Sequence, residues 1–339
     1  MKIGIHNSDT AYSKRWIVYC QINKINYIVV NAYADTIIHD LKGCEVFLWH
    51  HHHSDYRDVN FAKQLLFSLE QAGVKVFPDF KTGWHFDDKL GQKYLFEANN
   101  IPAAKAWAFY EKTSALKWVD NISYPKIFKL RGGAGSSNVK MIRDKGEAKR
   151  FINKAFGKGF SGFDYWSVCK DKFKLFFKKR ASLNEVLKMF ILSLFPRLGK
   201  AHLLPRQKGY VYFQEFIPND GYDIRIQITG DKALAMVRYT REGDFRASGS
   251  NNLTHETELL SSEVIKFAFD IADRLQLQSC ALDLVRDNRD NQLYVIENSY
   301  CYGVDQDEFD YGYWTRDGVY HKDKKFNGLD WIIQDLLEK

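Results

Sequence analysis

Residues 125–137 read Pro-Lys-Ile-Phe-Lys-Leu-Arg-Gly-Gly-Ala-Gly-Ser-Ser. Their apolar start is typical of a strand, and a second strand-like run follows at residues 139–142. The two runs predict a β-hairpin with a glycine-rich tip. Backbone N–H groups at such a tip can close over phosphate oxygens, and Lys129 would add a positive charge. A plain flexible turn is the alternative for the same residues.

The chain before this hairpin alternates strand-like and helical patterns. We expect a helix that begins with Asp58 as its cap and ends at Gly73. Four short runs rich in β-branched and aromatic residues predict strands at 3–6, 27–31, 46–49 and 74–78. Strand, helix and strand at this spacing indicate a parallel α/β sheet of the Rossmann-like kind. No Gly-x-Gly-x-x-Gly fingerprint follows the first strand, which argues against a dinucleotide site there.

The chain after the hairpin carries two acidic residues on neighbouring strands. Three strand-like runs and a helix capped by Ser262 precede them, and the predicted strands are 210–217, 223–229, 233–239, 280–285 and 293–297. Asp283 and Glu297 then lie near facing positions of the last two strands. Two carboxylates on one sheet face suit Mg²⁺ that bridges to nucleotide phosphates. Pairing of each acid with a surface Lys or Arg is the alternative.

Several arginines accompany these acids. Arginine binds phosphate or carboxylate through two parallel N–H donors, so a cluster of arginines suits phosphate transfer to a carboxylate. Each could also be an ordinary solvated charge. The polar residues concerned are Asp223, Arg225, Arg238, Arg241 and Arg246.

The order of these features resembles that of the ATP-grasp enzymes over roughly residues 85 to 300. The chain is similar to ribosomal-protein glutamate ligases, glutathione synthetases and D-alanine:D-alanine ligases. The resemblance implies an α/β ATP-grasp fold, with a Rossmann-like domain followed by two lobes. The segments expected are the Rossmann-like domain 1–85, the central lobe 86–168, a basic insertion 169–208 and the metal-binding lobe 209–339.

The resemblance also implies roles for individual residues. Lys89 and Lys129 would contact ATP phosphates, with Gly132, Gly133, Gly135 and Ser136 in the flexible loop. The adenine would meet Gln214, Glu215, Phe216 and Ile217, and Asp223 would bind the ribose. Arg225, Arg238 and Arg246 would be the catalytic cations, with Arg246 at the acyl phosphate. Asp283 and Glu297 match the metal carboxylates, whereas Ser299 stands where the family usually has Asn.

The activity that the resemblance implies is ligation of a carboxylate to an amine with ATP and Mg²⁺, through an acyl phosphate. An ATP-grasp kinase and a non-catalytic protein that binds ATP or docks on a membrane are the alternatives. A weaker resemblance to ATP-grasp proteins of bacterial capsule or lipopolysaccharide biosynthesis suggests a cell-surface glycan precursor as substrate. The acid and the amine would be small molecules or glycans.

Four consecutive histidines, His50 to His53, follow the strand that ends at residue 49. Ligands of open α/β sheets bind beyond the carboxyl ends of the strands, so His50 and His53 are candidate substrate contacts. An ordinary solvent-exposed loop is the alternative. Ser248, in the run Gly243-Asp-Phe-Arg-Ala-Ser-Gly249, is a third candidate for substrate contact.

The net charge of +7 comes from 49 basic and 42 acidic residues and is unevenly distributed. Residues 170–208 hold eleven Lys and Arg and two acids, and this leaves the remaining chain near −2. Within this basic segment Ser182 and Glu185 form a predicted capping box for a helix with one apolar face, ended by Pro196. Three interpretations stay open: a structural insertion packed on the core, docking to an anionic membrane or acceptor, and nucleic-acid binding. Nucleic acid is not expected as a partner because the rest of the chain is not basic.

Composition bounds the class of protein. A chain of 339 residues with 45% hydrophobic and 27% charged residues is typical of a globular enzyme and excludes disorder. Five scattered cysteines without a Cys-x-x-Cys pair argue against a disulfide framework or a structural zinc site. With no signal-like apolar start, we expect a cytoplasmic protein, either free or peripheral at the inner face of the membrane.

Overall fold

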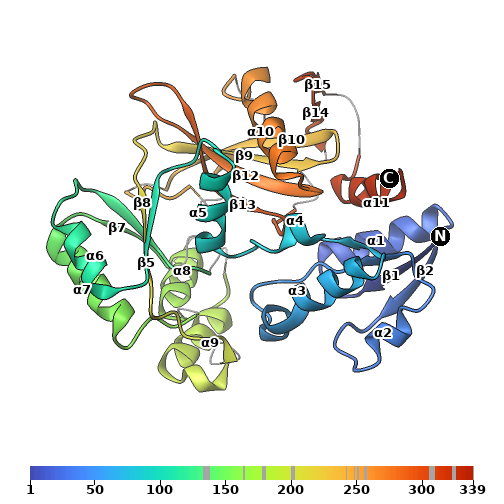
Figure 1. The fold of residues 1–339 in the computed structure, drawn as a ribbon, viewed down its shortest axis with the longest axis horizontal. Coiled ribbons are helices and arrows are strands. Elements are labelled where there is room, and N and C mark those ends of the chain that lie inside the picture. Colours follow the sequence, from blue (N-terminus) through green and yellow to red (C-terminus); the bar gives the residue numbers. More distant parts are fainter. Residues whose placement is uncertain are drawn as a thin grey trace. The chain divides into compact units, whose positions relative to one another are not determined.

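The chain folds into two compact units that do not follow its linear order (Figure 1). Unit 1 comprises Met1–Phe86, Leu95–Ala103 and Pro218–Lys339, and unit 2 comprises Asp87–Tyr94 and Ala104–Ile217. The predicted division into four segments stays a prediction. The structure, a computed structural model, describes residues 1–132, 138–162, 165–177, 181–199, 203–241, 243–247, 249, 252–255, 258–304, 310–322 and 326–338.

The N-terminal part of unit 1 is the predicted parallel α/β sheet, with strand order β2-β1-β3-β4. The strands are β1 Lys2–His6, β2 Asn26–Val30, β3 Val46–Leu48 and β4 Lys75–Phe77. The helices are α1 Ala11–Ile22, α2 Ile37–Asp40, α3 Tyr56–Gln71 and α4 Phe80–Gly83. The prediction of a Rossmann-like start is therefore confirmed.

A larger antiparallel sheet forms the rest of unit 1, with the path β13-β12-β9-β10-β14-β15 and β11 paired to β10. Its strands are β9 Tyr222–Thr229, β10 Lys232–Tyr239, β11 Leu253–Thr254, β12 Ser279–Arg286, β13 Leu293–Ser299, β14 Tyr313–Thr315 and β15 Tyr320–His321. Helices α10 Ser262–Leu275 and α11 Gly328–Glu338 accompany it.

Unit 2 is built on a second antiparallel sheet, of order β5-β8-β6-β7, and β6 and β7 form the predicted hairpin. The strands are β5 Ala106–Phe109, β6 Lys126–Lys129, β7 Val139–Ile142 and β8 Val211–Glu215. The helices are α6 Lys112–Val119, α7 Lys145–Phe156, α8 Tyr165–Phe177, α9 Leu183–Leu194 and the 3₁₀ turn Pro196–Leu198. Helix α5 (Lys89–Ala98) is divided between the two units.

The larger sheet has one apolar face and one face of mixed character. Side chains alternate along a strand with a period of two, so Ile224, Ile226 and Ile228 of β9 point to one side. That side packs with α10 in a core that also holds Leu282 and Val295. The opposite face carries Leu234 and Ala281, which are buried in a second core with α11. The same face also carries a charged region, which we call the polar face: Asp223, Arg225, Arg238, Asp283 and Glu297.

Two predicted helix caps are displaced. Helix α10 is capped by Ser261, whose hydroxyl accepts from the Val264 N–H, one residue before the predicted Ser262. Helix α3 is capped by Asp55, whose carboxylate accepts from the Arg57 N–H, instead of Asp58. At the start of each of these helices the sequence offers two candidate caps within three residues. The residue that lies just before the first turn makes the cap in both cases.

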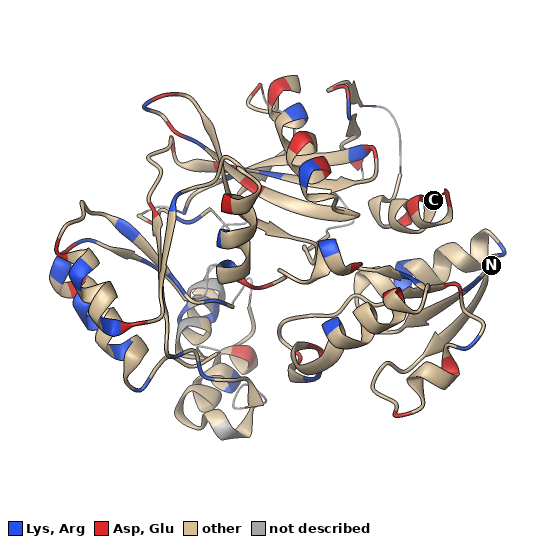
Figure 2. Ribbon diagram, in the orientation of Figure 1, with Lys and Arg blue, Asp and Glu red and all other residues tan. Residues whose placement is uncertain are grey.

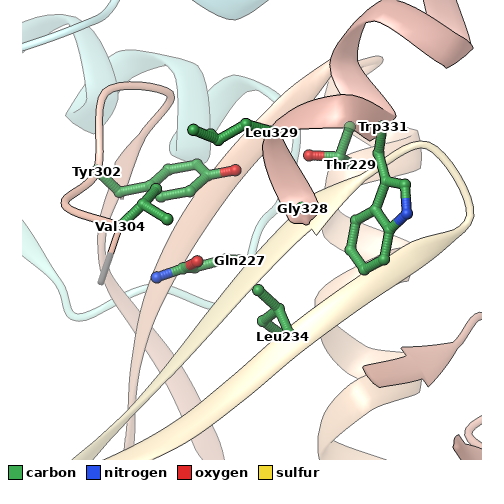
Figure 3. A pocket seen from close by; sticks show the side chains of 8 residues that line it. All are labelled: Gln227, Thr229, Leu234, Tyr302, Val304, Gly328, Leu329 and Trp331. Carbon is green, nitrogen blue, oxygen red and sulfur yellow. The ribbon is translucent and has the colours of Figure 1, made fainter. Parts of the chain in front are cut away.

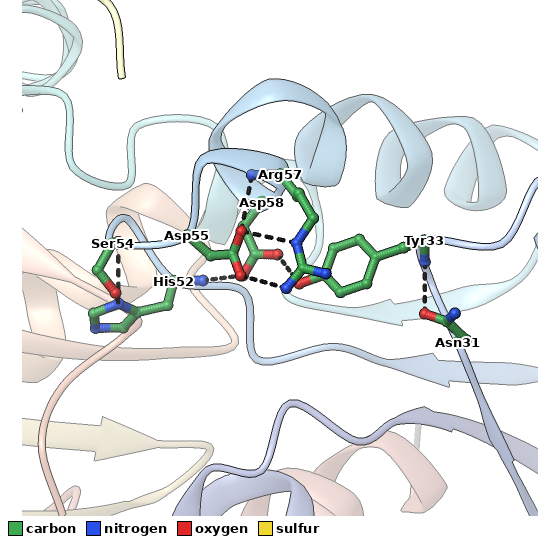
Figure 4. A network of polar contacts seen from close by, with 7 residues as sticks. All are labelled: Asn31, Tyr33, His52, Ser54, Asp55, Arg57 and Asp58. Carbon is green, nitrogen blue, oxygen red and sulfur yellow. Dashed lines mark hydrogen bonds and ion pairs between the residues drawn. The ribbon is translucent and has the colours of Figure 1, made fainter. Parts of the chain in front are cut away.

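Asp58 has a different task, shown in Figure 4. Its carboxylate accepts from the Tyr33 hydroxyl at 2.5 Å and from the His52 N–H at 2.7 Å. The Arg57 guanidinium pairs with Asp55 and lies 3.8 Å from the centre of the Tyr33 ring. Asp58 is buried, and this burial raises the pKa of its carboxyl although both hydrogen bonds act against the rise. The side chain therefore joins the histidine run to the sheet.

We expect Asp58→Ala to lower the free energy of unfolding by about 2–4 kcal/mol, because it leaves the His52 N–H and the Tyr33 hydroxyl without their buried acceptor. Urea denaturation followed by circular dichroism measures the change. Asp35→Ala, at an exposed turn position, is the matched control and should stay within about 0.5 kcal/mol of the unmodified protein. Equal stability of the two variants would show that the network contributes nothing.

Candidate functional site

With the exception of Arg246, the predicted metal-binding, catalytic and ribose-binding residues of unit 1 lie on the polar face of the larger sheet. In the strand register Asp283 faces Arg225 on one neighbouring strand and Glu297 on the other. Arg238 of β10 faces Asp223 of β9. Because directly opposed residues of antiparallel strands point to the same side, these five side chains lie on one face. The prediction that Asp283 and Glu297 occupy facing positions is confirmed.

Asp283 is held by two arginines. Arg225 donates to both carboxylate oxygens, with Nε–Oδ1 and Nη2–Oδ2 distances of 2.8 and 2.9 Å. Arg238 donates to both oxygens of Asp223 at 2.7 and 2.8 Å, and its Nη2 lies 2.9 Å from an Asp283 oxygen. Only 6% of Arg238 is exposed, so the interpretation of this residue as a solvated surface charge is wrong. A continuous network of alternating charges results.

The two aspartates of this network differ in pKa. Burial opposes ionisation of Asp283, but Arg225 and Arg238 outweigh burial and hold the pKa of this carboxyl below its ordinary value. Burial raises the pKa of Asp223 to about 6, against the pull of Arg238 and with the added repulsion of Asp283. Asp283 is therefore a stable carboxylate at neutral pH, which is the form that a cation requires.

Glu297 and Ser299 complete the predicted metal set on β13. Their spacing of two residues places both on the face that carries Asp283. The Ser299 hydroxyl donates to the Cys301 carbonyl oxygen at 2.9 Å, which leaves its lone pairs available to a metal or a water molecule. Among the described residues, no group of three or more His, Cys, Asp or Glu is arranged to hold a metal ion. Two carboxylates nevertheless fit Mg²⁺, which takes most of its remaining ligands from phosphates and water.

The predicted phosphate-binding lysines lie in unit 2. Lys129 ends β6 and Lys89 begins α5, and both are nearly buried, with exposed fractions of 6% and 5%. The Lys89 N–H donates to the Arg131 carbonyl oxygen at 2.9 Å, so the start of α5 lies beside the end of β6. The Lys89 ammonium is 3.6 Å from an oxygen of Asp87. The two lysines are thus brought to the same end of the hairpin strand.

The start of the glycine-rich loop packs closely against this region. A Cβ at Gly132 would lie 2.7 Å from an Asp87 carboxylate oxygen, so a larger residue here would require the Asp87 side chain to move. Arg131 next to it forms an ion pair with Asp88. The other predicted loop residues, Gly133, Gly135 and Ser136, lie outside the described residues.

The predicted adenine strand is β8 with the residues that follow it. Glu215 faces Lys126 in the register, and the Lys126 ammonium donates to a Glu215 oxygen at 3.1 Å. The Gln214 amide donates to the Ala104 carbonyl oxygen at 3.5 Å. Phe216 and Ile217 follow the strand end, where backbone groups leave the sheet ladder. Contact of these residues with adenine stays a prediction, with one Glu215 oxygen already engaged.

Sequence reasoning missed three partners of the predicted residues. Lys126 neutralises Glu215, Asp88 pairs with Arg131, and the Tyr210 hydroxyl accepts from the Arg131 N–H at 2.6 Å. Lys126 and Lys129 are three residues apart on one strand, so the period of two predicts that their side chains point to opposite faces of the sheet. No local signal identifies Tyr210.

Arg246, the predicted acyl-phosphate arginine, pairs with Asp244 two residues before it. Its Nε lies 3.0 Å from both Asp244 oxygens, and its Nη2 lies 2.6 Å from one of them. The neighbouring candidate Ser248 lies outside the described residues. The role of Arg246 at a reaction centre stays a prediction.

The histidines after β3 are divided between buried and partly exposed positions. His50 and His51 are 5% and 2% exposed, so the alternative of an ordinary exposed loop is wrong for them. His50 stacks on Tyr12 with ring centres 3.8 Å apart, and its Nδ1 lies 3.3 Å from the Thr10 hydroxyl. Burial lowers the pKa of His50 to about 3 and holds that of His51 well below its ordinary value. His53 is partly exposed.

A small pocket of unit 1 contains none of the predicted site residues (Figure 3). It has no charged side chain, so it offers nothing to bind phosphate or Mg²⁺. Its lining consists of Gln227, Thr229, Leu234, Tyr302, Val304, Gly328, Leu329 and Trp331. The residues predicted to bind ATP and Mg²⁺ lie elsewhere: in unit 1 on the polar sheet face, and in unit 2 at the lysine end of the hairpin.

The buried histidines predict a pH dependence of stability. His50 and His51 stay neutral in the folded protein, whereas in the unfolded chain they take up a proton near pH 6.5. Protonation therefore stabilises the unfolded chain, and the free energy of unfolding decreases as the pH falls below 6.5. Between pH 6.5 and 5.5 each should remove about 1 kcal/mol of the free energy of unfolding. We expect His50→Gln with His51→Gln to flatten this dependence in urea titrations, whereas His39→Gln, at an exposed histidine, should leave it unchanged. An unaltered slope in the double variant would contradict the burial of neutral histidines.

Comparison with known proteins bears on the fold. Residues 200–312 match the RimK-like ATP-grasp domain. The chain is 20% identical over 235 residues to the alpha-aminoadipate–LysW ligase LysX of Saccharolobus solfataricus. The aligned residues cover 68% of this chain and 68% of that protein.

Two solved structures share the fold. The biotin carboxylase domain of the 2-oxoglutarate carboxylase from Hydrogenobacter thermophilus gives a TM-score of 0.61 at 13% identity, over 100% of this chain and 70% of that one. The ATP-grasp ligase PsnB gives a TM-score of 0.56 at 11% identity, over 99% of this chain and 98% of that one. The parallel N-terminal sheet and the two antiparallel sheets are thus those of the predicted fold. The chain therefore has the ATP-grasp fold, and within it residues 200–312 match the RimK-like ATP-grasp domain.

Proposed function

We propose that this protein joins a carboxylate to an amine, with ATP as the energy source and an acyl phosphate as the intermediate. One observation carries the proposal: Asp283 is held as a carboxylate by Arg225 and Arg238 and lies opposite Glu297 on the polar face of a sheet. These five side chains, which are three carboxylates counting Asp223 and two guanidinium groups, carry one excess negative charge. Such a face attracts a divalent cation and also offers donors to phosphate oxygens.

The two lysines of unit 2 support the same reaction. Lys89 and Lys129 carry ammonium groups on nearly buried side chains, where an ionic interaction is screened less than at the surface. The triphosphate of ATP supplies the negative charge that these groups would compensate. Backbone N–H groups of the loop that begins at Gly132 would add neutral donors.

The reaction has two steps that balance in atoms and charge. A carboxylate oxygen attacks the γ-phosphorus of ATP, the bond to the β-phosphate oxygen breaks, and ADP leaves. The amine nitrogen then attacks the acyl carbon, phosphate leaves, and the amine loses a proton to give the amide. Because an acyl phosphate hydrolyses readily, the protein must exclude water while both steps proceed.

The charged side chains have distinct tasks in this scheme. Asp283 and Glu297 would hold Mg²⁺, which neutralises charge on the transferring phosphoryl group when bound. Arg225 and Arg238 keep Asp283 ionised and would donate N–H groups to phosphate oxygens. Arg246 would donate to the acyl phosphate after exchange of its partner Asp244.

The acid and the amine are open. The name of LysX assigns to that protein the ligation of α-aminoadipate to LysW, which makes amino acids and protein carboxylates suitable members of a substrate panel. A cell-surface glycan precursor stays a prediction from the sequence. Acceptor pockets are built from loops without a local signature, so a screen has to identify the substrate.

Hydroxylamine trapping tests the proposal. With Mg²⁺, ATP and a panel of carboxylic acids, the protein should release ADP and form a hydroxamate from at least one acid. Lys129→Met and Glu297→Gln should each reduce the rate roughly 100-fold, because each removes charge stabilisation of the transferring phosphoryl group.

Matched controls lie at exposed positions of neighbouring elements. Lys140→Met on β7 and Asp290→Asn in the turn between β12 and β13 should keep the rate of the unmodified protein. A stable phosphorylated acid without hydroxamate would favour the kinase. ATP binding without turnover on any acid would favour the non-catalytic alternative. Either of these two results would refute the proposed ligase activity.

A further inference from the structure

The basic segment forms a helical hairpin in unit 2 (Figure 1). Helix α9 begins with the predicted capping box, in which the Ser182 hydroxyl accepts from the Glu185 N–H and the Glu185 carboxylate accepts from the Ser182 N–H. The helix ends before Pro196, as predicted. It packs on α8 through Cys169 and Val186, which are both buried. The hairpin thus has an internal contact of its own.

The predicted apolar face of α9 does not pack on a core. Of its six apolar residues only Val186 is buried, and this contradicts the interpretation of the segment as an insertion whose helix packs on the protein. The exposed fractions of the other five lie between 42% and 56%. These five residues are Leu183, Leu187, Phe190, Ile191 and Leu194.

These five side chains form one stripe. At 100° per residue they fall within an arc of about 100°, the width of a face that normally lies against a core. Trp166 of α8 extends the stripe across the hairpin, with its ring centre 6.3 Å from that of Phe190. In Figure 2, α9 is mostly tan, the colour of residues without charge.

Exposed apolar side chains gather on this hairpin and on the residues that follow it. Among the described residues, 23 large hydrophobic side chains are exposed, and eleven of them lie between residues 166 and 203. Soluble proteins rarely expose a contiguous apolar patch of such extent unless it binds something. The additional members are Phe173, Phe177, Phe195, Leu198 and Leu203.

The segment that carries the stripe is rich in positive charge. Residues 170–208 hold eleven Lys and Arg and two acids, whereas the rest of the chain is near −2. Lys188 is exposed beside the stripe on α9, and Lys170 is exposed on α8 with its ammonium 5.6 Å from the Trp166 ring. One of the two acids, Glu185, is paired with Lys172 at 2.8 Å.

We propose that this face of α8 and α9 binds the surface of an anionic lipid bilayer, with α9 lying in the plane of the interface. An apolar stripe bordered by Lys and Arg is the pattern of an interfacial helix, and anionic headgroups complement its charge. A second copy of the chain would bring two equally basic segments together, which is unfavourable. Nucleic acid would leave the aliphatic side chains in water. No described helix has the length and apolar character to cross a bilayer, so the contact is peripheral.

Sedimentation with sucrose-loaded vesicles tests the proposal. The full chain should bind vesicles of phosphatidylcholine and phosphatidylglycerol at 3:1, and bind pure phosphatidylcholine at least about tenfold more weakly. Leu187→Asp with Ile191→Asp should weaken binding to anionic vesicles at least about tenfold, because the apolar stripe then carries charge. Lys170→Ala with Lys188→Ala should weaken it about 25-fold, at about fivefold for each lysine, and raising the salt should reduce this difference.

The matched control places the same two charges at exposed apolar positions of unit 1, as Ile22→Asp with Ile38→Asp, and should bind as the unmodified protein does. Circular dichroism and thermal melting confirm that each variant folds. Absence of binding to anionic vesicles, or equal binding by the Leu187/Ile191 variant, overturns the proposal. So does a lipid-free dimer in sedimentation velocity that this variant alone abolishes, because the face would then be an interface between copies. The proposal does not depend on the ligase activity.

Discussion

A carboxylate nine-tenths removed from solvent has to be compensated, and for Asp283 the compensation comes from Arg225 and Arg238. An ionised group costs a great deal of free energy to bury unless it is paired and hydrogen-bonded. The pairing links β9, β10 and β12, because each partner stands directly opposite another in the register. The polar face of the larger sheet therefore depends on these three side chains, while the apolar face depends on α10.

This arrangement also sets the chemistry that the face can support. Two guanidinium groups keep Asp283 ionised, and Asp223, which shares Arg238, is raised in pKa. A face with ionised Asp283, Glu297 opposite it and two fixed guanidinium groups can accommodate a metal and phosphate oxygens together, because it offers negative and positive groups side by side. Electrostatic stabilisation by groups already in position requires little reorganisation when charge moves during a reaction.

Much of the fold was predictable because its signals are local. The hairpin around Lys129, the parallel sheet at the N-terminus and the helix after Ser182 follow from period-two alternation, turn residues and a capping box. The facing positions of Asp283 and Glu297 followed from a short polar turn between two strands. The choice between Asp55 and Asp58 as the helix cap was not predictable from the sequence. Both residues precede the same apolar pattern, and the contacts of Asp58 with Tyr33 and His52 decide which one caps the helix.

The partners of the site residues were not predictable for a related reason. Arg238 and Asp283 are 45 positions apart in the chain, and only the strand register brings them together. The burial of His50 depends on Tyr12 and Thr10 from another element, and the exposure of the α9 stripe depends on what does not pack against it. Sequence spacing determines which side chains share a helix or strand face, whereas it says little about what that face contacts.

The central claim is that the polar sheet face is the metal and nucleotide site. Anomalous scattering from Mn²⁺ in crystals grown with a non-hydrolysable ATP analogue tests it most directly. The account predicts a manganese peak bound to Asp283 and Glu297 and to phosphate oxygens of the analogue, with Arg238 still paired to Asp223. A bound nucleotide whose manganese lies away from both carboxylates would contradict the account.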